Sequence, residues 1–273
     1  MIIKTTLGAA VAAATFALPA AAQDAATTEM TTPEVTAPDV TDVTSGTPHT
    51  ILFVGNSYLY YGDSIHNHVV RMARAAYPDD TFTYKSATIS GAYLDQHTLE
   101  PMLEEGKLGV DEPFDVVILQ GHSAAATTPE RLERFTAAAT EMDAAIDAYG
   151  AQTALYMTPA YGEAHKSFDP EMMGKNDTGY TSAGNDLDAL VIPVGLAFQM
   201  AYEERPEIEL HKHFDGSHPT LLGTYLAAAT VYATLYEESA VGNPYDYYGA
   251  VDAEDAAFLQ QVAEDAVAAY QSR

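Results

Sequence analysis

Short hydrophobic runs alternate along this chain with longer segments in which hydrophobic residues recur every three to four positions. The short runs predict β-strands at residues 50–54, 81–87, 116–119, 154–157 and 190–194. The longer segments predict helices at residues 64–77, 129–149, 196–204, 221–236 and 252–270. Strands that alternate with helices pair in parallel and are covered on both faces. The pattern therefore predicts an α/β fold, a three-layer α/β/α sandwich with a central, mostly parallel five-stranded sheet.

The first residues of the chain do not follow this alternation. Residues 1–22 resemble a secretory signal peptide, in which Lys4 precedes an apolar run from Leu7 to Leu18 and small residues lead to a cleavage site near Ala22. The apolar run is short for a membrane span, so we favour cleavage over an uncleaved anchor. We therefore expect a periplasmic or secreted protein with no stable membrane insertion after cleavage.

Two further segments lack a periodic pattern. Residues 23–48 consist of Thr, Ala, Pro and acidic residues with almost no large apolar side chains, which predicts a disordered linker ahead of one domain at residues 49–273. Residues 160–188 are rich in Gly, Asp, Lys and Met, and we interpret them as a long loop. Such a loop is either a functional lid or ordinary surface irregularity.

Charge and cysteine content narrow the classes of partner. The 273-residue chain has a formal net charge of -27, and residues 49–273 hold 11 basic and 34 acidic side chains. This balance argues against nucleic acid, anionic membrane surfaces and strongly polyanionic polymers as partners. The chain has no cysteine, so it forms no disulfide and carries no lipid on cysteine. Its stability must come from an ordinary hydrophobic core.

Polar residues stand directly after the first three predicted strands, where parallel sheets gather their sites. Ser57 follows the first strand, at a place where its hydroxyl would be presented and its N–H could face a developing oxyanion. Gly91 follows the second strand, and Gln120 to Ser123 follow the third. Each signal is weak alone, because most such residues are helix caps, turns or polar loops.

The stretch HKHFDGSHPT at residues 211–220 concentrates further candidates. His211, His213, Asp215 and His218 are ligand types for zinc, but their spacing departs from that of binuclear zinc hydrolases, and we favour a loop without metal for His211 and His213. Asp215 and His218 lie three residues apart, so the carboxylate can orient the imidazole, as the acid of a catalytic triad does.

The order of these motifs resembles that of the SGNH hydrolases, also called GDSL-like esterases. Gly-Asn-Ser at 55–57 matches the first block as a G-N-S variant, Gly91 the second, residues 121–123 the third, and D-G-S-H-P-T-x-x-G at 215–223 the fifth. The resemblance implies a flavodoxin-like fold, Ser57 as nucleophile, His218 as general base and Asp215 as its orienting acid. It also implies backbone oxyanion donors at Ser57 and Gly91, and no metal or organic cofactor.

One position departs from this pattern. The third block of the family normally reads G-x-N, with an amide that helps to form the oxyanion hole, and this chain has Ser123 instead. Ser123, Gln120 or His122 would have to replace that donor. Loss of one donor typically costs about 3 kcal/mol of transition-state stabilisation. Low activity, a relocated donor and a degenerate enzyme are all consistent with the change.

The resemblance and the predicted export indicate a secreted serine esterase that acts on carboxylic esters. The 18 tyrosines, which can stack on sugars, favour a carbohydrate O-acetylesterase, with a small-ester or lipid esterase close behind, although most tyrosines are expected to be packing residues. We expect substrate contacts from Asn56, Tyr58, Tyr93 and His122. Two alternatives stay open, namely a polysaccharide O-acetyltransferase with the same triad and a catalytically weak binding protein. The oligomeric state is not predicted.

Overall fold

The computed structural model describes residue 1 and residues 36–273. Its centre is one five-stranded sheet with the order β2-β1-β3-β4-β5, in which all four pairings are parallel. The strands are β1 (Thr50–Gly55), β2 (Thr83–Thr88), β3 (Val116–Gln120), β4 (Gln152–Tyr156) and β5 (Leu190–Ile192). This strand order is that of flavodoxin-like folds. The predicted α/β sandwich with a parallel five-stranded sheet is confirmed.

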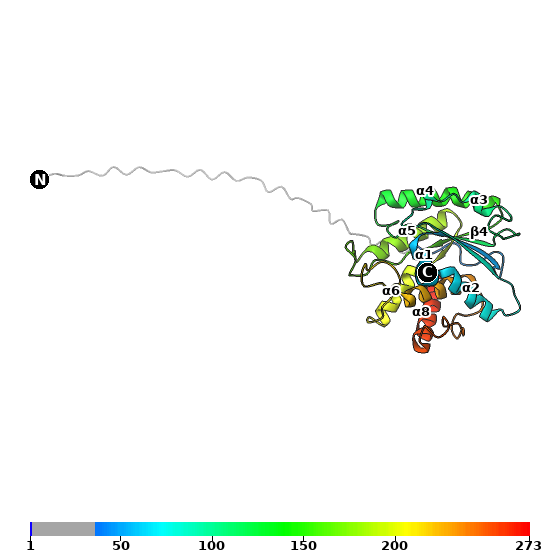
Figure 1. Ribbon diagram of the computed structural model, residues 1–273. Coiled ribbons are helices and arrows are strands. Elements are labelled where there is room, and N and C mark those ends of the chain that lie inside the picture. Colours follow the sequence, from blue (N-terminus) through cyan, green and yellow to red (C-terminus); the bar gives the residue numbers. More distant parts are fainter. Residues whose placement is uncertain (2–35) are drawn as a thin grey trace. The chain divides into compact units, whose positions relative to one another are not determined.

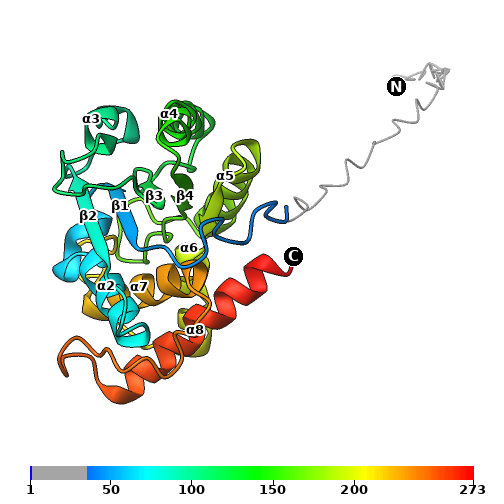
Figure 2. The same cartoon turned by 90° about the vertical axis from the view of Figure 1, so that its right-hand side faces the viewer.

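Helices cover both faces of the sheet, as Figures 1 and 2 show. One face packs against α2 (Ile65–Ala76), α6 (Val194–Glu204), α7 (Leu221–Leu235) and α8 (Ala253–Gln271). The other face packs against α3 (Glu100–Leu103), α4 (Pro129–Ala148) and α5 (Met172–Asp186).

The alternation of side chains along β1 explains this two-sided core. Ile51 and Phe53 lie in the cluster with α2 and α7, while Leu52 and Val54 lie in the cluster with α4 and α5. All four side chains are fully buried, because β1 lies between β2 and β3 and helices cover both faces of the sheet. Three short elements, which the sequence patterns do not predict, surround the carboxyl ends of the strands: α1 (Ser57–Tyr60), η1 (Tyr61–Asp63) and η2 (Leu94–Gln96).

The second half of the predicted loop at residues 160–188 is helical, and for this part the prediction is wrong. Residues 172–186 form α5, which packs on β4 and β5. Its glycines hid the helix in the sequence, yet two of them permit close packing: a Cβ at Gly179 would lie 3.0 Å from Ala126, and one at Gly184 would lie 2.4 Å from Val191. Tertiary contacts thus override a poor intrinsic helix propensity.

The folded domain also begins earlier than the predicted boundary at residue 49. The backbone N–H of Asp39 donates to Asn185, and that of Thr44 donates to Gln152, each at 2.9 Å. The Gln271 amide donates to the Thr41 carbonyl at 2.8 Å. Residues 37–48 therefore form a strap along the domain, which corrects the prediction that the whole linker is disordered.

Residues 2–22 of the predicted signal peptide and residues 23–35 of the predicted linker lie outside the described residues. Among the helices in the described part of the chain, none combines the length and the apolar character needed to span a membrane.

Candidate active site

Ser57 lies directly after β1, at the first position of α1. Asn56 caps this helix, because its side-chain oxygen accepts the N–H of Tyr58 at 3.2 Å. The amide nitrogen of Asn56 donates to the carbonyl of Ala92 at 3.0 Å and to that of Gly121 at 3.4 Å. Asn56 thus ties the loops after β2 and β3 to the turn that presents Ser57.

Ser57, His218 and Asp215 form a continuous chain of hydrogen bonds. The Nε2 atom of His218 lies 2.8 Å from the Oγ atom of Ser57. The Nδ1 atom of the same imidazole lies 2.6 Å from the Oδ2 atom of Asp215. With the Nδ1 proton directed at the carboxylate, Nε2 is left to accept the proton of the serine hydroxyl. Ser57 is buried, whereas His218 and Asp215 are half-buried.

The sequence around Asp215 folds into a tight turn that places this acid. Asp215 Oδ1 accepts the backbone N–H groups of Ser217 at 2.9 Å and of His218 at 3.1 Å. Gly216 has a φ of +61°, and a Cβ there would lie 2.6 Å from the backbone nitrogen of His165. Glycine is therefore required at this position of the motif. The carboxylate is held by backbone as well as by the imidazole.

These bonds set the charge state of the acid. Burial alone raises the pKa of the Asp215 carboxyl, but the hydrogen bonds from the His218 ring and from the N–H groups of Ser217 and His218 outweigh it and lower the pKa. Asp215 is therefore ionised at neutral pH. An ionised carboxylate 2.6 Å from Nδ1 fixes the imidazole tautomer and stabilises its protonated form.

The end of the same motif anchors the turn to α7. Thr220 caps α7, with its hydroxyl accepting the N–H of Gly223 at 3.1 Å. A Cβ at Gly223 would lie 2.2 Å from the carbonyl oxygen of Leu210, so glycine allows the two segments to touch. An antiparallel bridge between His211 and Pro219 closes the turn. The D-G-S-H-P-T-x-x-G motif is thus explained residue by residue as a rigid support for His218.

Aromatic rings pack against the imidazole. The ring of Tyr61 stacks on His218, with centroids 4.1 Å apart and planes at 19°. Tyr60 in turn stacks on Tyr61 with centroids 5.6 Å apart, and it is 36% exposed. Sequence reasoning did not assign Tyr61 to the site. Its place four residues after Ser57, at the start of η1, is the signal that could have indicated it.

Two of the predicted substrate contacts lie beneath the site instead of lining it. Asn56 is 2% exposed and Tyr58 is 3% exposed. The hydroxyl of Tyr58 bonds to Ser217 Oγ at 2.7 Å, and its ring lies 5.9 Å from that of His218. Because their polar atoms are already satisfied in the interior, these side chains support the triad residues. Direct substrate contact is therefore corrected to a positioning role.

The prediction that Gln120 donates to an oxyanion is also corrected. Its side chain is fully buried. Its Oε1 accepts the N–H of Asn56 at 2.9 Å, and its amide nitrogen donates to the carbonyl of Gly121. A Cβ at Gly55 would lie 2.5 Å from this side chain, so the amide is packed tightly under the turn. Gln120 braces the Ser57 turn from inside and has no access to a substrate oxygen.

Tyr93 and His122, the other predicted substrate contacts, stack on each other. Their ring centroids are 4.3 Å apart with planes at 10°. The Arg134 guanidinium lies 3.7 Å from the centroid of the Tyr93 ring, and two groups this close must occupy opposite faces. Tyr93 therefore has no free face for a sugar. His122 accepts the N–H of Ala124 at its Nδ1 atom, which leaves an Nε2–H donor, and burial with the positive charges of Arg131 and Arg134 lowers its pKa.

The remaining candidate donors to an oxyanion are the backbone N–H groups of Ser57 and Gly91 and the hydroxyl of Ser123. Neither the N–H of Ser57 nor that of Gly91 is hydrogen-bonded to another of the described residues. Gly91 has a φ of +65° and open space where a Cβ would stand. The Oγ atom of Ser123, at the position of the missing amide, lies 2.8 Å from the hydroxyl of Tyr161. Tyr161 comes from the segment after β4, which sequence reasoning did not connect with the site.

His211 and His213 contact different partners. His211 is 8% exposed, and its Nδ1 atom lies 2.8 Å from the hydroxyl of Tyr202. His213 is exposed and lies 2.9 Å from Glu209. Within residues 36–273 there is no group of three His, Asp or Glu side chains arranged to hold a metal ion. The histidines of this stretch therefore do not converge on one point.

Comparison with solved structures places this arrangement in a known fold. A protein assigned to the SGNH hydrolases, from Slackia heliotrinireducens, has a TM-score of 0.55 at 23% identity, over 68% of this chain and 97% of that one. The chain has the SGNH hydrolase fold. An acetylxylan esterase from Geobacillus stearothermophilus has a TM-score of 0.51 at 18% identity, covering 68% and 93% of the two chains. A DUF4886 family protein from Bacteroides uniformis has a TM-score of 0.66 at 19% identity, covering 81% and 95%.

Sequence comparison adds nothing to this assignment. No family model matches the chain, and no curated protein matches it. The SGNH fold accounts for the position of Ser57 after the first strand and of the Asp215–His218 pair near the end of the domain. Chemistry must therefore be argued from the residues of this chain, because identities below 25% establish the fold alone.

Proposed function

We propose that the protein is a serine esterase in which Ser57 is the nucleophile, His218 the general base and Asp215 the orienting acid. The observation that carries the proposal is the hydrogen-bond chain from Ser57 through His218 to Asp215, with distances of 2.8 and 2.6 Å. A serine is a weak nucleophile unless an adjacent base takes its proton, and this chain supplies the base and its support.

The reaction follows from this geometry. Ser57 Oγ attacks the ester carbonyl carbon while His218 Nε2 takes the hydroxyl proton, and the imidazolium is stabilised by ionised Asp215. The carbonyl oxygen becomes an oxyanion. Collapse of the tetrahedral intermediate breaks the bond to the alcohol, which receives the proton from His218. Water then attacks the acyl-enzyme by the same sequence and releases the acid and free Ser57.

The oxyanion requires donors, and the free backbone N–H groups of Ser57 and Gly91 are the first two. Ser123 is our candidate for the third. Burial raises the pKa of the Tyr161 phenol, so this group stays protonated and can donate to Ser123 Oγ. The proton of Ser123 is then available for the oxyanion. A relayed hydroxyl would take the place of the amide found in the SGNH pattern, with His122 Nε2–H as the alternative donor.

We further propose that the substrate is an acetylated carbohydrate and that the protein acts outside the cytoplasm. The exposed ring of Tyr60, stacked beside Tyr61 and His218, offers an aromatic surface next to the reacting centre, and such surfaces stack on sugar faces. One protein of the same fold is an acetylxylan esterase, and catalytic variants of it replace a serine or a histidine by alanine. The signal-like residues 1–22 support export.

The test is ester hydrolysis by wild-type protein, Ser57→Ala and a matched control, Ser90→Ala. Ser90 is exposed and lies 3.1 Å from Tyr60, so its replacement removes a nearby hydroxyl without touching the triad. We expect p-nitrophenyl acetate turnover to be lost in Ser57→Ala and kept in Ser90→Ala. Equal rates in all three proteins would exclude Ser57 as the nucleophile.

Acetylated xylo-oligosaccharides then test the substrate class by release of acetate. Acetate release indicates hydrolysis, whereas transfer of acetyl to an added sugar in preference to water would make the protein a transferase. Binding of the glycan by wild-type protein and by Ser57→Ala, without turnover of any ester, would indicate a binding protein.

A further inference from the structure

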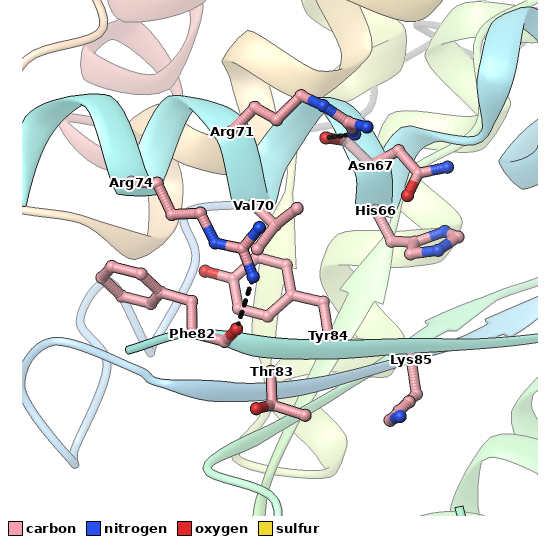
Figure 3. A pocket seen from close by; sticks show the side chains of 9 residues that line it. All are labelled: His66, Asn67, Val70, Arg71, Arg74, Phe82, Thr83, Tyr84 and Lys85. Carbon is pink, nitrogen blue, oxygen red and sulfur yellow. Dashed lines mark hydrogen bonds between the residues drawn. The ribbon is translucent and has the colours of Figure 1, made fainter. Parts of the chain in front are cut away.

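A hollow lies between α2 and the edge strand β2, apart from the triad residues. Its volume is about 300 Å³, and Figure 3 shows the side chains around it. The lining residues are His66, Asn67, Val70, Arg71, Arg74, Phe82, Thr83, Tyr84 and Lys85. None of these is acidic, although acidic residues outnumber basic ones by 39 to 12 in the chain. The hollow is therefore a positively charged patch on a protein with a large net negative charge.

The basic side chains of this hollow lack carboxylate partners. Of the 11 Lys and Arg residues in the described part of the chain, five form ion pairs: Lys107, Arg134, Lys175, Arg205 and Arg273. Arg71, Arg74 and Lys85 are three of the remaining six, and all three line the hollow. In a chain with so many carboxylates, three uncompensated cations on adjoining elements raise the positive potential around the hollow.

The two arginines are held in place by neutral groups. Arg71 donates from Nε to the hydroxyl of Tyr248 at 2.7 Å and from Nη1 to the carbonyl of Asn67 at 2.6 Å. Arg74 donates from Nη2 to the carbonyl of Phe82 at 3.0 Å. A guanidinium has five N–H donors, so each keeps several free after these bonds. Both are thus positioned without being neutralised.

The other side chains around the hollow come either from α2 or from β2, and not all of them point into it. In Figure 3, Arg74 and His66 extend from α2 toward β2 and Tyr84 extends from β2 toward α2, whereas Thr83 and Lys85 project from the opposite side of the strand. The Nδ1 atom of His66 is buried and has no hydrogen-bond partner among the described residues. Asp63, just before α2, acts on Arg71 only from beyond ion-pair distance.

We propose that this hollow binds an oxyanion, the carboxylate or phosphate group of a small ligand, through Arg74, while Arg71 on the far side of α2 adds positive potential. The free N–H groups of the Arg74 guanidinium match the paired oxygens of either group, and charge-assisted bonds of this kind are the strong ones. Phe82, Tyr84 and Val70 supply apolar walls for the body of the ligand. The site does not depend on the esterase chemistry, because none of its residues belongs to the triad.

The test is isothermal titration of the purified protein with glucuronate, glucose 6-phosphate and glucose at low ionic strength. These ligands share one sugar and differ in the charged group, so they separate a carboxylate site from a phosphate site and both from sugar binding. We expect saturable binding of at least one anion, none of glucose, and full retention in Ser57→Ala. Retention there shows that the signal does not require the Ser57 hydroxyl, and the arginine variants decide which site binds the anion.

Variants then locate the anion. Arg74→Gln should weaken binding at least tenfold, since Gln keeps a donor for the neighbouring carbonyl and removes the charge. Arg71→Gln should weaken it less, because its guanidinium points away from β2. Lys85→Gln should have a smaller effect, because its side chain projects from the other side of β2. Arg131→Gln is the matched control, being a basic residue in α4 that likewise forms no ion pair among the described residues.

Some outcomes would overturn the proposal. These are no binding of either anion by wild-type protein, or equal losses in Arg131→Gln and Arg74→Gln. If an arginine variant fails to fold, amide chemical-shift mapping on wild-type protein decides. Perturbations at residues 66–74 and 82–85 on titration with the anion support the site, and perturbations confined elsewhere exclude it.

Discussion

Acidification should destabilise this protein through one buried histidine, His211. Its imidazole is 8% exposed, and burial lowers its pKa from 6.5 to about 4, against smaller opposing effects of Asp215 and the Ala160 carbonyl. In the unfolded chain the pKa returns to about 6.5. The unfolded state therefore binds the extra proton first. This contribution to stability is complete above pH 6.5, and it is lost as the pH falls toward 4.

The magnitude follows from the two pKa values. Each unit of difference corresponds to about 1.4 kcal/mol, so the full loss is about 3 kcal/mol. Between pH 7 and pH 5, a range in which unfolding is readily measured, the loss of unfolding free energy is about 2 kcal/mol. Other buried or half-buried histidines have lowered pKa values for the same reason and add to the total, among them His66, His97 and His122. A comparison with a variant is needed to isolate His211.

Urea denaturation of wild-type protein and His211→Gln at pH 7, 6 and 5 measures this directly. Gln does not titrate and can still bond to the hydroxyl of Tyr202, which lies 2.8 Å from the His211 ring. The variant should be less stable at pH 7, and the gap should narrow by about 2 kcal/mol at pH 5. Parallel curves of unfolding free energy against pH for the two proteins would refute the assignment of this acid sensitivity to His211.

Three further predictions concern the site and α5. Asp215→Asn should lower kcat for p-nitrophenyl acetate by about 10³- to 10⁴-fold with little change in KM, because the imidazole loses its orienting charge, and an unchanged kcat would remove Asp215 from the mechanism. Ser123→Ala should lower kcat about a hundredfold and Tyr161→Phe less, measured with the same ester, whereas rates unaffected by both would transfer the donor role to another group. Gly184→Ala should cost about 1–3 kcal/mol because its Cβ would lie 2.4 Å from Val191, while Gly174→Ala, in open space on the same helix, should be neutral or stabilising. Thermal unfolding of the two variants would contradict the packing argument if both shifted alike.

The sheet and most helices are predictable from the sequence because their residues obey simple periodicities. Buried runs such as 116–119 have no polar interruption, and the helix at residues 129–148 has a Thr cap, a Pro in its first turn and a Gly after its end. The helix at residues 172–186 obeys no such rule. Its Gly179 and Gly184 are tolerated because neighbouring elements occupy the space of a side chain, and that space exists only in the folded domain.

The candidate site shows the same division. The proximity of Ser57 to the loops after β2 and β3 is predictable, because the carboxyl ends of parallel strands share one edge. The convergence of Asp215 and His218 on Ser57 is expected only from the resemblance to the SGNH pattern. The catalytic roles of these residues stay predictions until they are measured. The direction of a polar side chain after a strand is not predictable in this way. Gln120 turns inward to the Asn56 N–H, and nothing local in the sequence distinguishes it from the outward-facing alternative.

The strap of residues 37–48 determines how the folded domain would be displayed on a support. Its contacts lie at the amino ends of the strands: Thr44 bonds to Gln152, the first residue of β4, and Asp39 bonds to Asn185, shortly before β5. Ser57 stands at the opposite pole, beyond the carboxyl end of β1. A bead, surface or fused carrier attached directly at the strap would therefore meet the domain on the side away from Ser57 and leave the triad facing the medium.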